Sequence, residues 1–248
     1  KYFMSKKMLN ENYDIVVVGA GPAGLSFACS MANTSLKVLV VERSSLKLIS
    51  EPQPDGREIA LTHNSLKILK KIGVWDFIDE SDVSPLEEAK VFDGESEALL
   101  NFDTNKSSIE ALGYLVPNYL IRKALYKKAS QIENVTIQYD ISVENVKTSA
   151  NAANIVLSNE VTIKSKLIVA ADSRFSEIRR KMGVPSSMKD FSKVMIIARV
   201  SHENTHNQTA LECFKYGHTL ALLPLNGNVS SVVLTVSTDQ SEDVLKMD

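Results

Sequence analysis

Three short runs of aliphatic residues predict buried strands, because a strand covered on both faces is apolar at successive positions. These runs lie at residues 15–18, 37–41 and 167–171. A glycine-rich turn at residues 19–24 follows the first run, and small and apolar residues then predict a helix over residues 25–33. The first two runs and this helix together form a strand, turn, helix and strand of about 30 residues, the length of a βαβ unit.

The remaining pattern divides the chain into two kinds of structure. Helices are predicted near residues 64–72, 118–129 and 175–182, and short strands near 88–92, 98–102 and 114–116. Strands of a meander are predicted at residues 135–139, 142–147, 155–157 and 161–163. Beyond Pro185 only strand-like runs follow, at residues 194–200, 210–216, 220–223 and 229–236, which predicts an antiparallel sheet. We therefore expect an α/β domain over residues 1–85 and 112–187, with a sheet domain over residues 86–111 and 188–248.

Composition narrows the class of protein. The chain has 248 residues, of which 44% are hydrophobic and 23% charged, as in an ordinary globular protein. A net charge of −2 gives no general attraction for nucleic acid. Its two cysteines, Cys29 and Cys213, are too few for a disulfide framework, and no run of 18 or more apolar residues predicts a membrane span. These features indicate a cytoplasmic protein, and the spacing of its four histidines predicts no metal site.

The turn GAGPAG matches the pattern G-x-G-x-x-G that binds the pyrophosphate of a dinucleotide. The first glycine permits the tight turn, the second allows close approach of the phosphates, and the third lets the helix pack on the strand. Glu42 ends the next strand, where its carboxylate would accept hydrogen bonds from an adenosine ribose. A glycine-rich turn of an unrelated α/β fold is the simpler alternative. The residues predicted to bind the cofactor here are Gly19, Gly21, Pro22, Ala23, Gly24 and Glu42.

Several segments together resemble one family. GAGPAG with VVER resembles FAD-binding proteins of the glutathione-reductase type, and within them the single-component aromatic hydroxylases. DGREIAL, GYLVPN, AADSRFSEIR, ALECF and LALLPL resemble successive blocks of the ubiquinone-biosynthesis hydroxylases. The resemblance implies a glutathione-reductase-type FAD-binding domain with an inserted substrate sheet. It also implies FAD as cofactor, NAD(P)H as reductant, and O2 as the source of the oxygen placed on an aromatic ring. The expected substrate is a polyprenylated phenol.

The resemblance also suggests roles for residues outside the turn. Arg57, Asn118 and Asp172 would contact the phosphates or riboses of FAD, and Arg43 and Arg122 would lie near them. A solvated surface charge is the simpler explanation for each of the three arginines, and a plain helix cap for Asn118. Residues proposed to contact the substrate are Phe214, Leu222 and Leu223. No acid, base or nucleophile is assigned, because the cofactor performs the chemistry in such enzymes.

Two departures from the family pattern affect the expected function. Ala171 and Ser173 stand on either side of Asp172, where the family has glycine. The later GDAxH segment is absent, so we expect a C-terminally truncated form of a longer protein. The alternatives are a fragment that binds nucleotide without catalysis, another flavin-dependent reductase or hydroxylase, and an NAD-dependent dehydrogenase. An apolar substrate would further suggest peripheral association with the inner membrane. The sequence is compatible with either a homo-oligomer or a biosynthetic complex.

Overall fold

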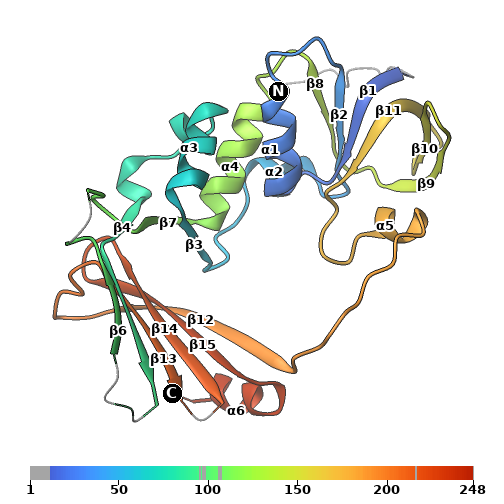
Figure 1. Ribbon diagram of the computed structural model, residues 1–248. Helices are drawn as coiled ribbons and strands as arrows, with labels where there is room; N and C mark the ends of the chain where they lie inside the picture. Colours follow the sequence, from blue (N-terminus) through green and yellow to red (C-terminus); the bar gives the residue numbers. More distant parts are fainter. Residues whose placement is uncertain (1–11, 95, 97–98, 106–107, 216, 248) are drawn as a thin grey trace. The chain divides into compact units, whose positions relative to one another are not determined.

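The computed structural model describes residues 12–94, 96, 99–105, 108–215 and 217–247 (Figure 1). The chain divides into two compact units. Unit 1 comprises residues 1–52 and 122–186, and unit 2 comprises residues 53–121 and 187–248. The boundary after residue 186 falls one residue before the expected end of the α/β domain. Residues 53–85 and 112–121, expected in that domain, are instead grouped with the sheet domain in unit 2.

Unit 1 is built on a six-stranded sheet in the order β8-β2-β1-β11-β10-β9. Its strands are β1 (Asn12–Val18), β2 (Val38–Val41), β8 (Val135–Gln138), β9 (Val143–Thr148), β10 (Ala153–Leu157) and β11 (Thr162–Ala170). The first three and β11 are parallel, and β10 and β9 continue the sheet in antiparallel pairing. As predicted, β1 and β2 are buried strands of this sheet, and all four residues of β2 are buried. Complete burial of each such side chain contributes about 1.5–3 kcal/mol.

The helices of unit 1 are α1 (Pro22–Ser30), α2 (Leu46–Ser50), α5 (Glu177–Lys181) and all but the first four residues of α4 (Asn118–Ala129). α1 begins within the glycine turn, three residues earlier than predicted, and Pro22 suits its first position because a first helical residue needs no N–H partner. Helix α5 is shorter than the predicted span of residues 175–182 because Asp172 and Ser176 fix its start.

Three predictions for unit 1 are wrong in detail. β8 is not part of a meander, since it pairs in parallel with β2. The two runs at residues 161–163 and 167–171 form one strand, β11, because it spans from the pairing with β10 to the pairing with β1. The end of β11 is also less buried than the pattern predicts, and Leu167 is 49% exposed.

Unit 2 contains a six-stranded sheet in the order β12-β15-β14-β13-β5-β6 and a small sheet in the order β3-β7-β4 (Figure 1). The large sheet comprises β5 (Glu88–Asp93), β6 (Leu99–Asp103), β12 (Lys193–Ser201), β13 (Thr209–Lys215), β14 (His218–Leu225) and β15 (Val229–Ser237). The small sheet comprises β3 (Glu58–Leu61), β4 (Ser84–Leu86) and β7 (Gly113–Pro117). The large sheet is antiparallel as predicted, except that β5 and β13 are parallel.

Short helices complete unit 2. They are α3 (His63–Lys71), η1 (Trp75–Phe77), η2 (Glu80–Asp82), η3 (Thr238–Gln240) and α6 (Ser241–Leu245). Thr62 caps α3, because its hydroxyl accepts a hydrogen bond from the N–H of Ser65. Most apolar side chains of the large sheet are only half-buried. Within the residues described, no helix combines the length and the hydrophobicity that crossing a membrane requires.

Candidate functional site: a dinucleotide turn and a substrate sheet

The glycine turn after β1 has the geometry that its sequence predicts. Gly19 adopts a φ of +106°, and its N–H donates to the carbonyl of Val41 over 2.8 Å. A Cβ on Gly19 would overlap the carbonyl oxygen of Ala171, and one on Gly24 would overlap the carbonyl oxygen of Gly19. These two glycines are therefore required by the packing of the turn itself.

Gly21 has a different role. Its φ of −74° and ψ of 178° are open to any residue, and a Cβ at this position would meet no atom within 4 Å. The space beside Gly21 lies at the start of α1, where the first N–H groups have no partner inside the helix and the helix dipole is positive. No acidic residue occupies this first turn. The open space and the free donors fit a dinucleotide pyrophosphate, so the residues present are suited to FAD.

Glu42, the residue after β2, lies beside this turn. One carboxylate oxygen, Oε2, accepts a hydrogen bond from the N–H of Ala20 over 2.7 Å, and Oε1 accepts one from the N–H of Ser44 over 2.8 Å. Each oxygen keeps a further lone pair that a ribose hydroxyl could use. Arg43 is exposed, whereas Arg122 is half-buried on α4. Their predicted positions near the cofactor remain predictions.

The Asp172 segment lies against the glycine turn, since the N–H of Ala171 donates to the carbonyl of Val18 over 2.8 Å. The Asp172 carboxylate itself caps α5. It accepts hydrogen bonds from the hydroxyl of Ser176 over 2.5 Å and from the N–H groups of Glu177 and Ile178 over 2.7 and 3.1 Å. Ser173 adopts a φ of +103°, a conformation that costs energy for a residue with a Cβ. The contact of Asp172 with a ribose or pyrophosphate stays a prediction.

Asp55, which sequence reasoning did not select, joins Arg57 and Asn118 in unit 2. Its Oδ2 accepts hydrogen bonds from the Arg57 guanidinium and, over 2.8 Å, from the Asn118 side chain. Burial of the Asp55 carboxylate acts to raise its pKa, but the hydrogen bonds from Arg57 and Asn118 outweigh it and the pKa is lowered. The N–H of Asn118 also donates to the carbonyl of Arg57 over 2.9 Å. Asp55 therefore holds two of the predicted cofactor residues in fixed positions.

The three predicted substrate residues do not share one face of the sheet. Directly opposite residues of paired strands carry their side chains on the same face. Phe214 lies opposite Thr219 and Leu211 lies opposite Leu222. Because side chains alternate along a strand, Phe214 and Leu223 lie on one face and Leu222 on the other. Only Phe214 and Leu223 are therefore placed to contact the same bound ring.

We call the side of the large sheet that carries Phe214 and Leu223 the Arg199 face. The register places Arg199 opposite Ser231, and Ser231 opposite Leu223, on adjacent strands. This face also carries Asp93, Lys193, Ile197, Glu212, Ala221 and Val233. It is a mainly apolar surface on which Arg199 is exposed.

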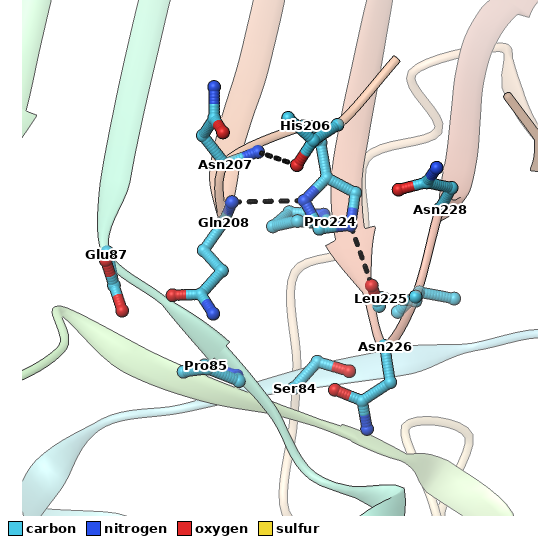
Figure 2. Close-up of a pocket in the computed structure, with 12 residues that line it drawn as sticks. Ser84, Pro85, Glu87, His206, Asn207, Gln208, Pro224, Leu225, Asn226 and Asn228 are labelled. Carbon is cyan, nitrogen blue, oxygen red and sulfur yellow. Dashed lines mark hydrogen bonds between the residues drawn. The ribbon is translucent and has the colours of Figure 1, made fainter. Parts of the chain in front are cut away.

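A pocket of about 470 Å³ lies elsewhere in unit 2, between the β12–β13 and β14–β15 loops and β4 (Figure 2). The His206 ring projects into it. The Nδ1 atom of His206 accepts a hydrogen bond from the N–H of Gln208 over 3.0 Å, so Nε2 carries the proton and donates to the carbonyl of Leu225 over 2.7 Å. Both ring nitrogens are thus used by the backbone, and the ring stabilises the loops.

Neither metal binding nor a reactive thiol is indicated elsewhere in the described residues. They contain no group of three or more His, Cys, Asp and Glu side chains that could hold a metal ion. Burial raises the pKa of the Cys29 thiol to about 11, so this cysteine is protonated at neutral pH and suited to packing.

Comparison with characterised proteins relates this site to ubiquinone hydroxylases. The chain is 46% identical over 247 residues to the ubiquinone hydroxylase UbiM of Neisseria meningitidis serogroup C, which covers 98% of this chain and 52% of the relative. It is 27% identical over 226 residues to the ubiquinone hydroxylase UbiL of Rhodospirillum rubrum, covering 91% of this chain and 52% of that protein. The chain thus spans about half the length of the curated relatives it matches.

Solved structures show the same fold at low sequence identity. PqsL of Pseudomonas aeruginosa in complex with 2-aminobenzoylacetate is 16% identical, with a TM-score of 0.78 over 94% of this chain and 63% of that one. The p-nitrophenol 4-monooxygenase PnpA of Pseudomonas putida is 18% identical, with a TM-score of 0.75. The match covers 96% of this chain and 61% of PnpA. The sequence itself matches the family described as FAD binding domain over residues 12–245. With the open phosphate turn and the Glu42 carboxylate beside it, the chain belongs to this FAD binding domain family, whose cofactor is FAD.

Proposed function

We propose that this chain forms part of an FAD-dependent monooxygenase that hydroxylates an aromatic ring, a polyprenylated phenol of ubiquinone biosynthesis. NAD(P)H would be the reductant and O2 the source of the new oxygen atom. The observation that carries the proposal is the 46% identity to the ubiquinone hydroxylase UbiM over 98% of the chain. FAD, when bound, supplies the redox chemistry, so the protein's residues need only bind and orient the reactants and exclude water.

The residues of each unit support one part of this function. In unit 1 the open backbone at Gly21 and the carboxylate of Glu42 would hold the pyrophosphate and the adenosine ribose. In unit 2 Asp55 orients Arg57 and Asn118, whose donors suit phosphate or ribose oxygens. The Arg199 face supplies an apolar surface suited to an aromatic ring. Because catalysis depends on holding the ring in a reactive position, this rigid sheet is a suitable support.

The test is oxygen incorporation by the protein at its full natural length. The purified enzyme is supplied with FAD, NADH or NADPH, isotopically labelled O2 and a prenylated phenol, and the products are analysed by mass spectrometry. We expect one labelled oxygen atom in the ring of the product. The Gly21→Val variant serves as the control and should give none. Reduction of the substrate without oxygen incorporation would instead support the alternative, a flavin-dependent reductase.

We extend this proposal to the location of the enzyme. A polyprenylated substrate resides in a membrane, so peripheral association with the membrane surface would give the enzyme access to it. Flotation with lipid vesicles should recover the full-length protein in the lipid fraction. Analytical ultracentrifugation of the same preparation distinguishes a monomer from a homo-oligomer. Recovery of the protein only in the lipid-free fraction would contradict the membrane part of the proposal.

A further inference from the structure

An ion pair joins the loop that carries Arg57 to the Arg199 face. Arg199 on β12 donates through Nη2 to Oε1 of Glu58, the first residue of β3. A Cβ on neighbouring Gly56 would lie 3.6 Å from the Ile197 side chain, which is two residues before Arg199. The predicted cofactor loop and the predicted substrate face are therefore in direct contact within unit 2.

The two partners of this ion pair are in different environments. The side chain of Glu58 is 1% exposed, whereas that of Arg199 is 48% exposed. The second carboxylate oxygen of Glu58, Oε2, is buried and has no partner among the described residues. The Oγ of Ser231, directly opposite Arg199, is likewise buried without a partner. A buried carboxylate thus holds the guanidinium of a side chain that is about half exposed.

The position of Arg199 suits a ligand of the size of one ring. Leu223 lies two strands from Arg199 on the same face, a separation of roughly 10 Å. Ser231 lies between them on β15. Val233 on β15 and Ala221 on β14 form the next pair on the same face. A ring lying on these apolar side chains would place a substituent oxygen within reach of the guanidinium N–H groups. This arrangement offers one hydrogen-bonding position beside an apolar surface.

The charges around Arg199 indicate which substituent it accepts. Arg199 and Glu58 together carry no net charge. Glu212 and Asp93 lie on the same face but three and four strands from Arg199, beyond the range at which exposed charges interact in salt, so Glu58 is the acidic group that the described residues place against the guanidinium. A ligand carboxylate at Arg199 would therefore lie beside a buried carboxylate that already compensates the guanidinium charge. A neutral phenol brings no such repulsion, since it needs only a donor for its oxygen.

We propose that Arg199 binds the oxygen substituent of an uncharged phenolic ring and that Glu58 makes this site reject aromatic carboxylates. Glu58 is then a specificity-determining residue that acts through Arg199. The inference rests on the proposed function for the identity of the site, but it concerns binding and requires no turnover.

The experiment compares two ring ligands in the full chain by isothermal titration calorimetry. 4-Hydroxybenzoate and 4-methylphenol are similar in size and differ in charge. Glu58→Gln removes the buried negative charge and leaves Arg199 uncompensated. We expect this variant to bind 4-hydroxybenzoate about tenfold more tightly than wild type, since a like charge a few ångströms away is removed. Its affinity for 4-methylphenol should change by less than about twofold.

Two control variants make the result specific to this site. Glu88→Gln makes the same charge change on the opposite face, where Glu88 pairs with Lys90, and should leave both affinities unchanged. Glu58→Gln combined with Arg199→Met removes the whole ion pair without leaving a buried charge, and should abolish the gain for 4-hydroxybenzoate. An unchanged affinity in Glu58→Gln, or an equal gain in either control, would overturn the proposal. Loss of hydroxylation with the binding pattern intact would instead count against the proposed function alone.

Discussion

Replacement of Gly21 by valine should separate cofactor binding from folding. Gly21 has a φ of −74° and a ψ of 178°, which a β-branched residue adopts without strain. The added Cβ meets no protein atom within 4 Å, so the isopropyl group would project into the space proposed for the pyrophosphate. The same substitution at Gly19 or Gly24 would collide with backbone atoms and damage the turn itself.

The expected magnitudes follow from this geometry. Valine is a poorer helix N-cap than glycine, but it also restricts the unfolded chain, so the free energy of unfolding should change by less than about 1 kcal/mol. Displacement of the pyrophosphate would lose at least two hydrogen bonds to a charged group, each contributing about 1.5–3 kcal/mol. The affinity for FAD should therefore fall by about 10²–10⁴-fold.

The assay is calorimetric titration of FAD into the wild type and the variant, with thermal unfolding of both measured in parallel. The melting temperatures should agree within about 4 °C. Ser30→Val, which places a valine at the exposed far end of the same helix, is the matched control and should bind FAD normally. An unchanged FAD affinity in a folded Gly21→Val variant would refute the placement of the pyrophosphate at this turn.

Three further predictions concern single side chains. Glu42→Ala should weaken ADP binding by about 1–3 kcal/mol in calorimetry, because a charged acceptor for the ribose is lost, and an unchanged affinity would leave Glu42 with only its bonds to the turn. Ser173→Gly should raise the free energy of unfolding by about 1 kcal/mol in urea titration, because it relieves the strained φ of +103°. Ser30→Gly, at an ordinary helical position, should lower the free energy of unfolding. A loss of stability in both variants would contradict the claim that Ser173 is strained. Asp55→Asn should be less stable than wild type at pH 7. The pKa of Asp55 is lower in the folded state than its ordinary value of 3.8, so the stability difference between wild type and variant should disappear as the pH falls below 3.8 and through the folded-state pKa. A stability difference that does not change with pH would exclude the charge as its cause.

The sequence by itself determined the local features of this protein. The glycine turn could be recognised because the spacing of its three glycines is a local pattern, in which Gly19 and Gly24 meet steric requirements and Gly21 leaves open space beside the backbone. The buried strands β1 and β2 could be recognised because burial on both faces leaves a continuous apolar run. Alternation along a strand would also have separated Leu222 from Leu223, a signal that the search for apolar substrate residues overlooked.

Only the tertiary structure decided the features that depend on distant partners. The runs at residues 161–163 and 167–171 became one strand because β11 pairs with β10 along one part and β1 along another. Asp55 reaches Asn118 across 63 residues, and Arg199 reaches Glu58 across 141. In the sequence, charged residues so far apart cannot be told from ordinary surface groups, because the neighbouring residues do not indicate which distant residue will pair with them in the fold. Their chemistry arises from burial and pairing, and both are set by the packing of segments that the chain alone does not place together.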